Sequence, residues 1–328
     1  MGSFLPLNLD LTSIPDRPRT LNEYMSDNRK RIGIFDSGVG GLTVLRALYR
    51  QLPDESYLYF GDTARLPYGT RSAAEILQFM REILVMMEQE GVKMAIVACN
   101  TSAALALDTT RSEFAFPILG PILPGAKAAV GQGRRIGTIA TPATAKSGTY
   151  RRAMLEADKT VKVWEVGCPE FVPIVEGNRI YEPETYRIVR GYLQPLLRQQ
   201  IDTLVYGCTH YPHLAPVLKK ILPPTVQLVD PAIALAQAAA RELDLLGLRG
   251  EGNPLPTRFG VSGCPEQFAR LSLQWLGFTP SVEKVRLPQI CPESAPLSGQ
   301  HRTNSGTWGL GDAVSTSVAV SDGKNTSI

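Results

Sequence analysis

Two cysteines in this sequence are each followed by polar residues that could assist acid–base chemistry. Cys99 precedes Asn100, Thr101 and Ser102, and Cys208 lies two residues before His210. The reference pKa of a thiol is about 8.5, and nearby charges shift it, so a cysteine can remove or donate a proton near neutral pH. Two thiols on opposite faces of one carbon could exchange its hydrogen and invert its configuration. The pair therefore predicts proton transfer at a stereocentre.

Each of these thiols has a neighbour that could tune it. Helix-capping residues follow Cys99, so we expect this cysteine near a helix N-terminus, where partial positive charge favours the thiolate. Positions i and i+2 at a strand end share a face, so the His210 imidazole could orient the Cys208 thiol or exchange a proton with it. Tyr211 and Pro212 then read as the start of a helix.

Each residue has a simpler structural interpretation when it is taken alone. A cysteine at the end of a buried strand is commonly a small core residue, and a cysteine two residues before a histidine is commonly incidental. Asp36 and Ser37, followed by three glycines among four residues, could form only a capped turn from strand to helix. Tyr68 follows a proline and could lie in a surface turn. These simpler interpretations weaken because all the residues map to the same end of the predicted strands.

Strand and helix patterns alternate through the part of the chain that carries these residues. This alternation predicts an α/β fold with parallel sheets and right-handed crossovers. The predicted strands are Arg31–Phe35, Ser56–Phe60 and Met94–Cys99, and the predicted helices are Leu42–Leu52, Ala74–Gly91 and Asn100–Thr110.

The sequence also contains an internal repeat. The segment RRIGIFDSG has an echo in RRIGTIATPAT, and KMAIVACNT has an echo in DTLVYGCTH, at similar offsets along the chain. We interpret the repeat as two α/β units related by a pseudo-twofold axis, although one such pair alone could arise by chance. Ligands of open parallel sheets bind beyond the carboxyl ends of the strands. Two facing units would therefore bring both cysteines to a shared cleft.

The expected organisation has two pseudo-symmetric domains and two extensions. The first domain comprises residues 31–122 plus 234–290, the second comprises residues 123–233, and the active site lies in the cleft between them. Residues 1–30 form a polar N-terminal extension. Residues 291–328 are rich in Ser, Thr and Gly and form a C-terminal tail that we expect to be disordered.

Composition and charge exclude several classes of function. The net charge is +3 and its lysines and arginines are scattered, which disfavours nucleic-acid binding. No stretch reaches the roughly 18 apolar residues of a membrane span, and the N-terminus lacks the pattern of a signal peptide. The five cysteines are sparse, odd in number and not spaced for structural zinc. We therefore expect free thiols in a reducing cytoplasm.

Four long motifs, in order, resemble the glutamate racemases of the aspartate/glutamate racemase superfamily. The motifs are IGIFDSGVGGLTVLRAL, YFGDTARLPYGTRS, IVACNTSAALAL and LVYGCTHYPHL, and the resemblance covers roughly Arg31 to Gly277. It implies a homodimer of two-domain α/β subunits that interconverts L- and D-glutamate without pyridoxal phosphate, metal or another cofactor. It also implies a bacterial, cytoplasmic enzyme that supplies D-glutamate for peptidoglycan synthesis and so supports cell-wall biogenesis and cell shape.

The resemblance also implies roles for individual residues. Cys99 would act on D-glutamate with help from Asp36, and Cys208 would act on L-glutamate with help from His210. Glu176, in FVPIVEG, is similar to an acidic residue placed near that histidine. Besides Asp36 and His210, the residues matched to substrate binding are Ser37, Pro67, Tyr68, Gly69, Asn100, Thr101, Thr141, Thr144 and Thr209. The polar groups among them are hydroxyls, amides and backbone N–H groups, which can bind carboxylates without an arginine.

Two other functions remain open at this point. An aspartate racemase, or an isomerase of another dicarboxylate, would use the same two thiols. A cysteine hydrolase would use Cys208 as nucleophile and His210 as base, would form an acyl-enzyme, and would leave Cys99 without a role. Cys168 and Cys264 are interpreted as loop or packing residues, and Cys291 is given no role.

Overall fold

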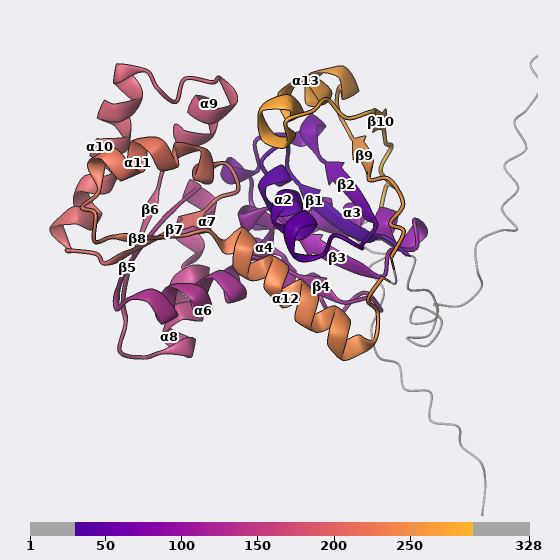
Figure 1. Ribbon diagram of the computed structural model, residues 1–328, viewed down its shortest axis with the longest axis horizontal. Coiled ribbons are helices and arrows are strands. Elements are labelled where there is room, and N and C mark those ends of the chain that lie inside the picture. The colour runs from indigo at the N-terminus through magenta and orange to yellow at the C-terminus, as the bar shows by residue number, and fades with distance from the viewer. Residues whose placement is uncertain (1–29, 251, 291–328) are drawn as a thin grey trace, which may run out of the picture. The chain divides into compact units, whose positions relative to one another are not determined.

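The strands of the described chain form two parallel sheets, as Figure 1 shows in a computed structural model. The structure describes residues 30–250 and 252–290, all within one unit of the chain, Met1–Pro296. The expectations for the N-terminal extension, the C-terminal tail and Cys291 fall outside the described residues, apart from Lys30, and stay predictions. The predicted fold class, α/β with parallel sheets, is confirmed.

The first sheet has six strands in the order β10-β9-β2-β1-β3-β4. Their bounds are β1 Ile32–Asp36, β2 Tyr57–Gly61, β3 Met94–Val97, β4 Ile118–Leu119, β9 Arg258–Val261 and β10 Val282–Lys284. The second sheet has four strands in the order β6-β5-β7-β8. Their bounds are β5 Arg135–Ala140, β6 Lys162–Gly167, β7 Thr203–Gly207 and β8 Gln227–Val229.

The two sheets repeat one strand order. In the first sheet β1 lies between β2 and β3, and β4 follows β3; in the second sheet β5 lies between β6 and β7, and β8 follows β7. The segments that echo one another in the sequence are β1 with β5 and β3 with β7. The internal repeat in the sequence therefore corresponds to a repeat in sheet topology.

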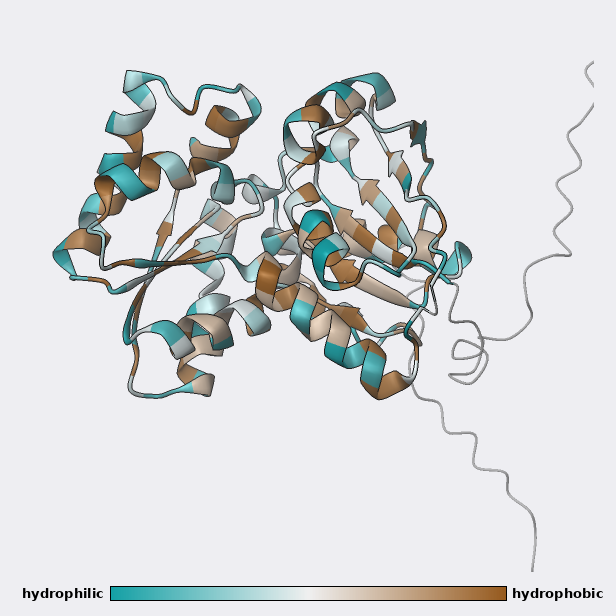
Figure 2. Cartoon of the chain, viewed as in Figure 1, coloured by the Kyte–Doolittle hydropathy of each residue, from teal (hydrophilic) through white to brown (hydrophobic). Residues whose placement is uncertain are grey.

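Helices cover the sheets on both faces, and side-chain alternation along the strands explains why. In β1, Ile32 and Ile34 pack with Leu45 of one helix, whereas Phe35 packs in a separate cluster with Ile83 of another helix. Strands covered on both faces are nearly continuously apolar, as Figure 2 shows. The helices around the first sheet are α2 Leu42–Gln51, α3 Ala73–Gln89, α4 Asn100–Leu105, α5 Leu107–Thr110, α12 Pro231–Leu246 and α13 Pro265–Leu276. Those around the second are α6 Ile122–Gln132, α7 Pro142–Ser147, α8 Thr149–Ala157, α9 Phe171–Glu176, α10 Pro183–Arg198 and α11 Ala215–Ile221.

Short 3₁₀ helices lie in the segments that follow β2 and β7. They are η2 Thr63–Arg65, η3 Tyr68–Thr70 and η4 Tyr211–Leu214. The predicted helix start at Tyr211 and Pro212 is thus a 3₁₀ turn that leads into α11. The predicted helix over Asn100–Thr110 is divided into α4 and α5, because the Ala106 backbone (φ −135°, ψ −18°) departs from helical geometry.

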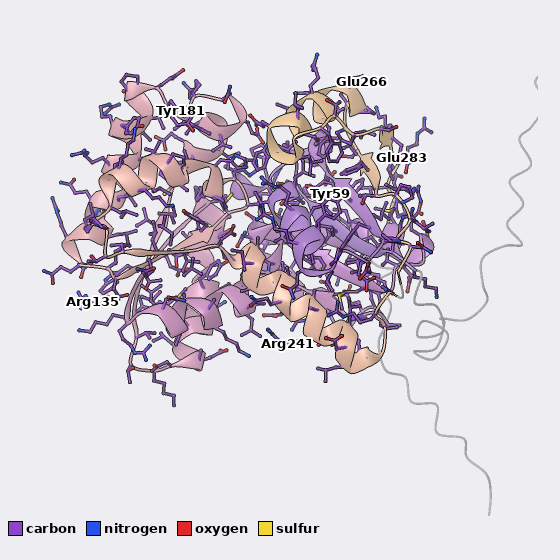
Figure 3. The ribbon with its side chains drawn as sticks, in the orientation of Figure 1. Tyr59, Arg135, Tyr181, Arg241, Glu266 and Glu283 are labelled. Carbon is purple, nitrogen blue, oxygen red and sulfur yellow. The ribbon has the colours of Figure 1, made fainter. Side chains whose placement is uncertain are left out.

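Side chains inside the first sheet prepare its carboxyl end. Tyr59 of β2, labelled in Figure 3, is fully buried, and its hydroxyl donates to the Gly38 carbonyl oxygen at 2.7 Å. This bond fixes the turn that follows β1. Among the residues described, no helix combines the length and the apolar character needed to cross a membrane.

Candidate active site

A cavity of about 350 Å³ lies where the carboxyl ends of strands from both sheets meet. Its walls come from segments that immediately follow β1, β2, β3, β5, β6 and β7. The residues that line it are Ser37, Leu66, Pro67, Tyr68, Gly69, Thr70, Cys99, Asn100, Thr101, Thr141, Pro142, Cys168, Pro169, Val172, Pro173, Glu176, Cys208, Thr209 and His210. A cavity of this size suits a small organic ligand.

The cavity lining contains both cysteines that the sequence analysis singled out. Cys99 lies two residues after β3, and Cys208 directly follows β7, the topological equivalent of β3. The two side chains are 5% and 7% exposed, so water reaches each sulfur mainly through the cavity. A small ligand in the cavity would therefore lie against thiols from two different sheets.

His210 connects Cys208 to a carboxylate. Its Nδ1 lies 3.8 Å from the Cys208 Sγ, and its Nε2 lies 3.0 Å from the Glu176 Oε1. The predicted contact between Cys208 and His210 is present, but the backbone reason differs from the prediction. Cys208 follows the end of β7, and the chain has turned into a helical conformation at His210 (φ −78°, ψ −27°). The turn brings the two side chains together.

The surroundings of His210 favour its protonated form. Burial alone would lower the pKa of this histidine, but hydrogen bonds to Cys208 and Glu176 and the negative charge of Asp36 outweigh it and raise the pKa to about 10. The imidazole is almost completely buried and meets the indole of Trp275 edge-on, with 5.4 Å between the ring centroids. A protonated ring in this place can give a proton to the Cys208 sulfur and adds positive charge to the cavity wall.

Cys99 lies in a different electrostatic environment. It occupies the N-cap position of α4, as expected, but burial and then the charge of Asp36 raise the pKa of its thiol to about 12. The Ser102 backbone N–H at the helix start lowers the pKa by less than these two effects raise it. The helix start thus favours the thiolate, as expected, but burial and the charge of Asp36 outweigh this effect. At neutral pH Cys99 holds its proton.

Asp36 ends β1 and is fully buried behind the cavity wall. Its carboxylate accepts hydrogen bonds from the Gly38 backbone N–H at 3.1 Å and from the Thr209 hydroxyl at 3.4 Å. Burial raises the pKa of Asp36, and the positive charge of His210 opposes that rise. Asp36 is not among the residues that line the cavity, so its predicted role in substrate binding stays a prediction, while its charge acts on Cys99.

Gly40 allows the turn after β1 to pack against the histidine. A Cβ atom at this position would lie 2.3 Å from the Thr209 Oγ1 and 2.5 Å from the His210 Nδ1, distances that real side chains do not reach. In addition, the Thr43 hydroxyl lies 3.3 Å from the Thr209 carbonyl oxygen. Gly40 therefore does more than shape a turn, because it lets the loop after β1 of one sheet contact the histidine that follows β7 of the other.

Three threonine hydroxyls cluster at another part of the cavity. The Oγ1 atom of Thr101 lies 3.0 Å from that of Thr141 and 3.2 Å from that of Thr144, and the last two are 2.9 Å apart. Thr101 and Thr141 line the cavity, whereas Thr144 is fully buried and supports them from behind. Direct ligand contact by Thr144 is thus not indicated by the geometry.

The orientation of Asn100 follows from a buried tyrosine. The Tyr150 hydroxyl, on α8, donates to the Asn100 Oδ1 at 2.7 Å. With its oxygen held there, the amide can offer its NH₂ group, a hydrogen-bond donor, to the cavity. Within residues 30–250 and 252–290, no lysine or arginine lines the cavity, so the donors that these residues offer an anionic ligand are hydroxyls, this amide, backbone N–H groups and His210.

The structure gathers most of the predicted site residues. All of those named from the sequence line the cavity except Asp36 and Thr144, which lie directly behind it. Sequence reasoning missed the place of Cys168 in the cavity lining: this cysteine follows β6, and we expected only a loop or packing residue. The pair Gly167-Cys168 after a strand mirrors Gly207-Cys208 and could have indicated this position. Sequence reasoning also missed the apolar wall formed by Leu66, Pro142, Pro169, Val172 and Pro173.

The sequence of this chain is similar to those of known enzymes. A sequence profile of the Asp/Glu/hydantoin racemase family matches residues 32–239. The glutamate racemase of Nostoc sp. is 65% identical over 257 residues, which cover 78% of this chain and 88% of that protein. The glutamate racemase of Synechocystis sp. is 63% identical over 268 residues, which cover 81% of this chain and 96% of that protein.

Solved structures show the same similarity. Glutamate racemase isoform RacE1 from Bacillus anthracis superposes with a TM-score of 0.77 at 37% identity, covering 80% of this chain and 99% of that one. Glutamate racemase from Francisella tularensis, in complex with D-glutamate, superposes with a TM-score of 0.75 at 31% identity, covering 79% of this chain and 98% of that one. The chain therefore belongs to the Asp/Glu/hydantoin racemase family of enzymes, in which these similar proteins are glutamate racemases.

Proposed function

We propose that this protein interconverts L- and D-glutamate by a two-base mechanism in which Cys99 and Cys208 act on opposite faces of the substrate Cα. The observation that carries the proposal is that two thiols from different sheets line one small cavity. Each thiol also has its own titratable neighbour: the charge of Asp36 acts on Cys99, and His210 contacts Cys208. A single-nucleophile hydrolase would need only one such pair.

In the direction from L-glutamate, the Cys208 thiolate removes the Cα proton and becomes a thiol. The electron pair left on Cα then takes the proton of the Cys99 thiol on the other face, which leaves Cys99 as the thiolate. The raised pKa of Cys99 keeps its proton in place for this donation. His210, 3.8 Å from the Cys208 sulfur, is placed to exchange a proton with it between turnovers.

In the direction from D-glutamate, the roles of the two thiols are reversed. Cys99 must first lose its proton, and we assign Asp36 to accept it, because burial raises the pKa of this carboxylate and makes it a stronger base. The Cys99 thiolate then removes the Cα proton, and Cys208, which has taken a proton from His210, donates it to the other face of Cα and becomes the thiolate. Proton transfer by a positioned side chain typically contributes about 10² to 10⁴ in rate, so loss of either thiol should nearly abolish racemisation.

We assign the hydroxyls of Ser37, Thr101, Thr141 and Thr209 and the amide of Asn100 to bind the two substrate carboxylates. Charge-assisted hydrogen bonds of this kind are stronger in a site closed to water. The protonated His210 supplies positive charge that the lining otherwise lacks. The Leu66, Pro142 and Val172 side chains exclude water around Cα.

We extend the proposal to the biology and organisation that the family resemblance implies. The enzyme would be a cytoplasmic homodimer that supplies D-glutamate for peptidoglycan, with one domain at residues 31–122 plus 234–290 and another at 123–233. The strands of each sheet fall within one of these two proposed domains, which supports this division. Light scattering during gel filtration would test the dimer, and growth rescue by D-glutamate in a deletion strain would test the cellular role.

The experiment that tests the mechanism is hydrogen exchange at Cα in D₂O. The wild type should incorporate deuterium into the product enantiomer from either direction, and Cys99→Ser and Cys208→Ser should each lose racemisation by at least about a hundredfold. Cys264→Ser is the matched control, because this cysteine is exposed and lies outside the cavity lining. Near-normal racemisation by either active-site variant would show that its thiol is not one of the two bases.

The same assay separates the remaining alternatives. Run with L-aspartate, it would identify an aspartate racemase. An acyl-enzyme trapped on Cys208 with a substrate ester would instead indicate a hydrolase.

A further inference from the structure

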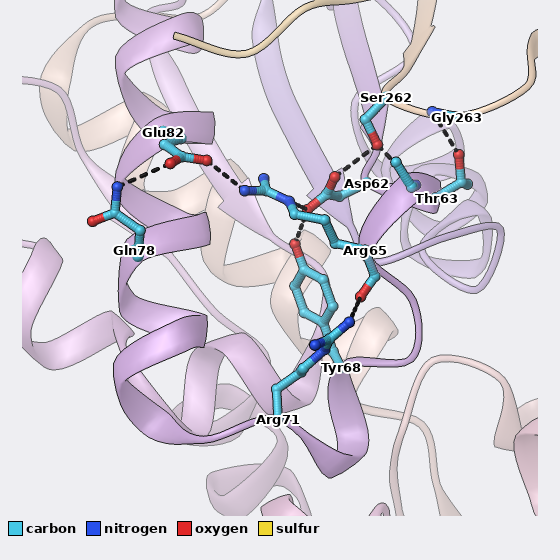
Figure 4. Close-up of polar contacts among 10 residues, drawn as sticks. Asp62, Thr63, Arg65, Tyr68, Arg71, Gln78, Glu82, Ser262 and Gly263 are labelled. Carbon is cyan, nitrogen blue, oxygen red and sulfur yellow. Dashed lines mark hydrogen bonds and ion pairs between the residues drawn. The ribbon is translucent and has the colours of Figure 1, made fainter. Parts of the chain in front are cut away.

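A buried carboxylate outside the cavity organises one of its walls. Asp62 directly follows β2 and has no exposed surface. It accepts hydrogen bonds from the Tyr68 hydroxyl, from the Arg65 Nε at 2.6 Å and from the Ser262 hydroxyl at 2.7 Å (Figure 4). Tyr68 and Arg65 come from the segment after β2, whereas Ser262 comes from the segment after β9, so Asp62 joins two segments that are far apart in the sequence. A buried charge is tolerated when it is paired and hydrogen-bonded in this way.

The Arg65 side chain is itself held by contacts with α3. Its guanidinium pairs with Glu82 of α3 and lies 4.1 Å from the centre of the Phe79 ring of the same helix. The Glu82 carboxylate also accepts a hydrogen bond from Gln78 at 2.9 Å, as Figure 4 shows. Asp62 is therefore fixed relative to α3, and it can in turn fix what binds to it.

The segment that Asp62 holds is a part of the cavity wall that contains neither a strand nor an α-helix. Five consecutive residues, 66–70, line the cavity, and only the short η3 turn lies within them. Tyr68 is their central member, and its ring is 3% exposed and packs 5.6 Å from Phe79, centroid to centroid. Its hydroxyl donates to Asp62, so this hydroxyl is directed away from the cavity, and the predicted role of Tyr68 in substrate binding stays a prediction. Tyr68 contributes its ring and backbone to the wall instead.

We infer that Asp62 is a positioning residue for substrate binding, acting through Tyr68 on the 66–70 wall. The inference rests on the proposed function for its kinetic readout. The carboxylate accepts from Tyr68 and Arg65 on one oxygen and from Ser262 on the other. An amide has a single acceptor oxygen and no negative charge, so Asp62→Asn cannot accept from Tyr68 and Arg65 on one side and from Ser262 on the other, and every hydrogen bond that it keeps with Tyr68 or Arg65 is weaker than the bond to the carboxylate.

The test compares Asp62→Asn, Tyr68→Phe and Ser262→Ala. The first two should raise KM for both glutamate enantiomers on the order of tenfold, with kcat within about threefold of wild type, because a hydrogen bond to a charged group is lost but the thiols are untouched. Ser262→Ala is the matched control, since it removes a donor to Asp62 without touching Tyr68, and it should leave KM within about twofold. The double variant Asp62→Asn/Tyr68→Phe should raise KM no more than the more severe of the two single variants does, because both changes remove the same interaction.

A second readout does not depend on the proposed reaction. A loosened wall exposes Cys99, so iodoacetamide should alkylate this cysteine several-fold faster in Asp62→Asn and Tyr68→Phe than in wild type or Ser262→Ala, as measured by peptide mass spectrometry. If Asp62→Asn and Tyr68→Phe keep wild-type KM and alkylation rates, or if they lower only the melting temperature, Asp62 does not position the wall. Inactivity of the wild type with glutamate would overturn the proposed function, and the alkylation rates would still decide the role of Asp62.

Discussion

The two thiols of the cavity differ in the groups that surround them. Cys208 lies beside a histidine with a raised pKa. The pKa of the Cys99 thiol is itself raised, by burial and by the negative charge of Asp36. Chemically alike side chains at topologically equivalent positions thus lie beside groups of different charge before substrate binds. This asymmetry suits a reaction in which one thiol must donate while the other accepts.

The raised pKa of His210 has a consequence for stability. Its folded-state pKa of about 10 lies above the ordinary histidine value near 6.5, so between these pH values the folded protein binds a proton that the unfolded chain does not. The contribution of His210 to the free energy of unfolding is therefore complete below about pH 6.5 and is lost as the pH rises through about 10.

Urea unfolding at several pH values measures this contribution. From about pH 7 to pH 10.5, the free energy of unfolding of the wild type should fall more steeply than that of His210→Asn, which lacks the titrating group. Parallel curves for the two proteins would show that His210 titrates at an ordinary pH when folded.

At the scale of elements, the turn from β1 to α2 packs so closely against Thr209 and His210 that Gly40 has no room for a side chain. Gly40→Ala would place a methyl group within 2.5 Å of two atoms of the Thr209–His210 segment. The histidine must then move away from Cys208 or Glu176. Because displacements of about 1 Å can reduce rates by about 10², we expect kcat to fall by about this factor.

Gly131→Ala is the matched control for this prediction. Gly131 lies within α6, and a Cβ at that position meets nothing within 4 Å. Alanine there should leave kcat unchanged and stabilise the helix by about 0.5–1 kcal/mol. Equal kcat values for the two alanine variants would contradict the assigned role of Gly40. Racemisation rates and urea unfolding curves provide both measurements.

At the scale of the whole molecule, the two ends of the first sheet serve different purposes. The carboxyl ends of its strands carry the cavity, while the opposite end holds a buried ion pair. The Lys93 Nζ lies 2.6 Å from Glu55 and donates to the Leu248 carbonyl oxygen at 2.7 Å, and the Gly250 N–H donates to Glu55 at 2.7 Å. These bonds attach the chain after α12 to the starts of β2 and β3, far along the strands from the cysteines.

Lys93→Met should therefore reduce stability and leave catalysis intact. Removing one partner leaves a buried charge uncompensated, which costs about 3–5 kcal/mol of unfolding free energy. Adding Glu55→Gln should recover part of the loss, because the uncompensated charge is then removed. Urea unfolding and the kcat of the folded enzyme measure the two effects. A kcat that changed together with stability would mean that this end of the sheet communicates with the cavity.

How much of this could be predicted from the sequence depends on the range of the interactions. Apolar runs, glycine-rich turns and capping residues act over a few neighbours, so the alternation of strands and helices was predicted, and so was the position of Cys99 at a helix start. The repeat of strand and cysteine segments also predicted that both thiols lie at carboxyl ends of equivalent strands. The carboxyl ends of parallel strands lie at one edge of their sheet, so the strand pattern alone was enough to predict this placement.

Only the tertiary structure decided the properties that depend on distant partners. The high pKa of Cys99 arises from burial and from Asp36, which lies on another strand. The use of the Tyr68 hydroxyl by Asp62, and of the Asn100 oxygen by Tyr150, depends on segments that meet only after folding. Burial and hydrogen-bond partners set the charge and the orientation of each side chain, and both are properties of the packed chain. Residue types alone therefore predicted proton transfer by two cysteines, but they could not predict which groups hold a proton in the folded protein.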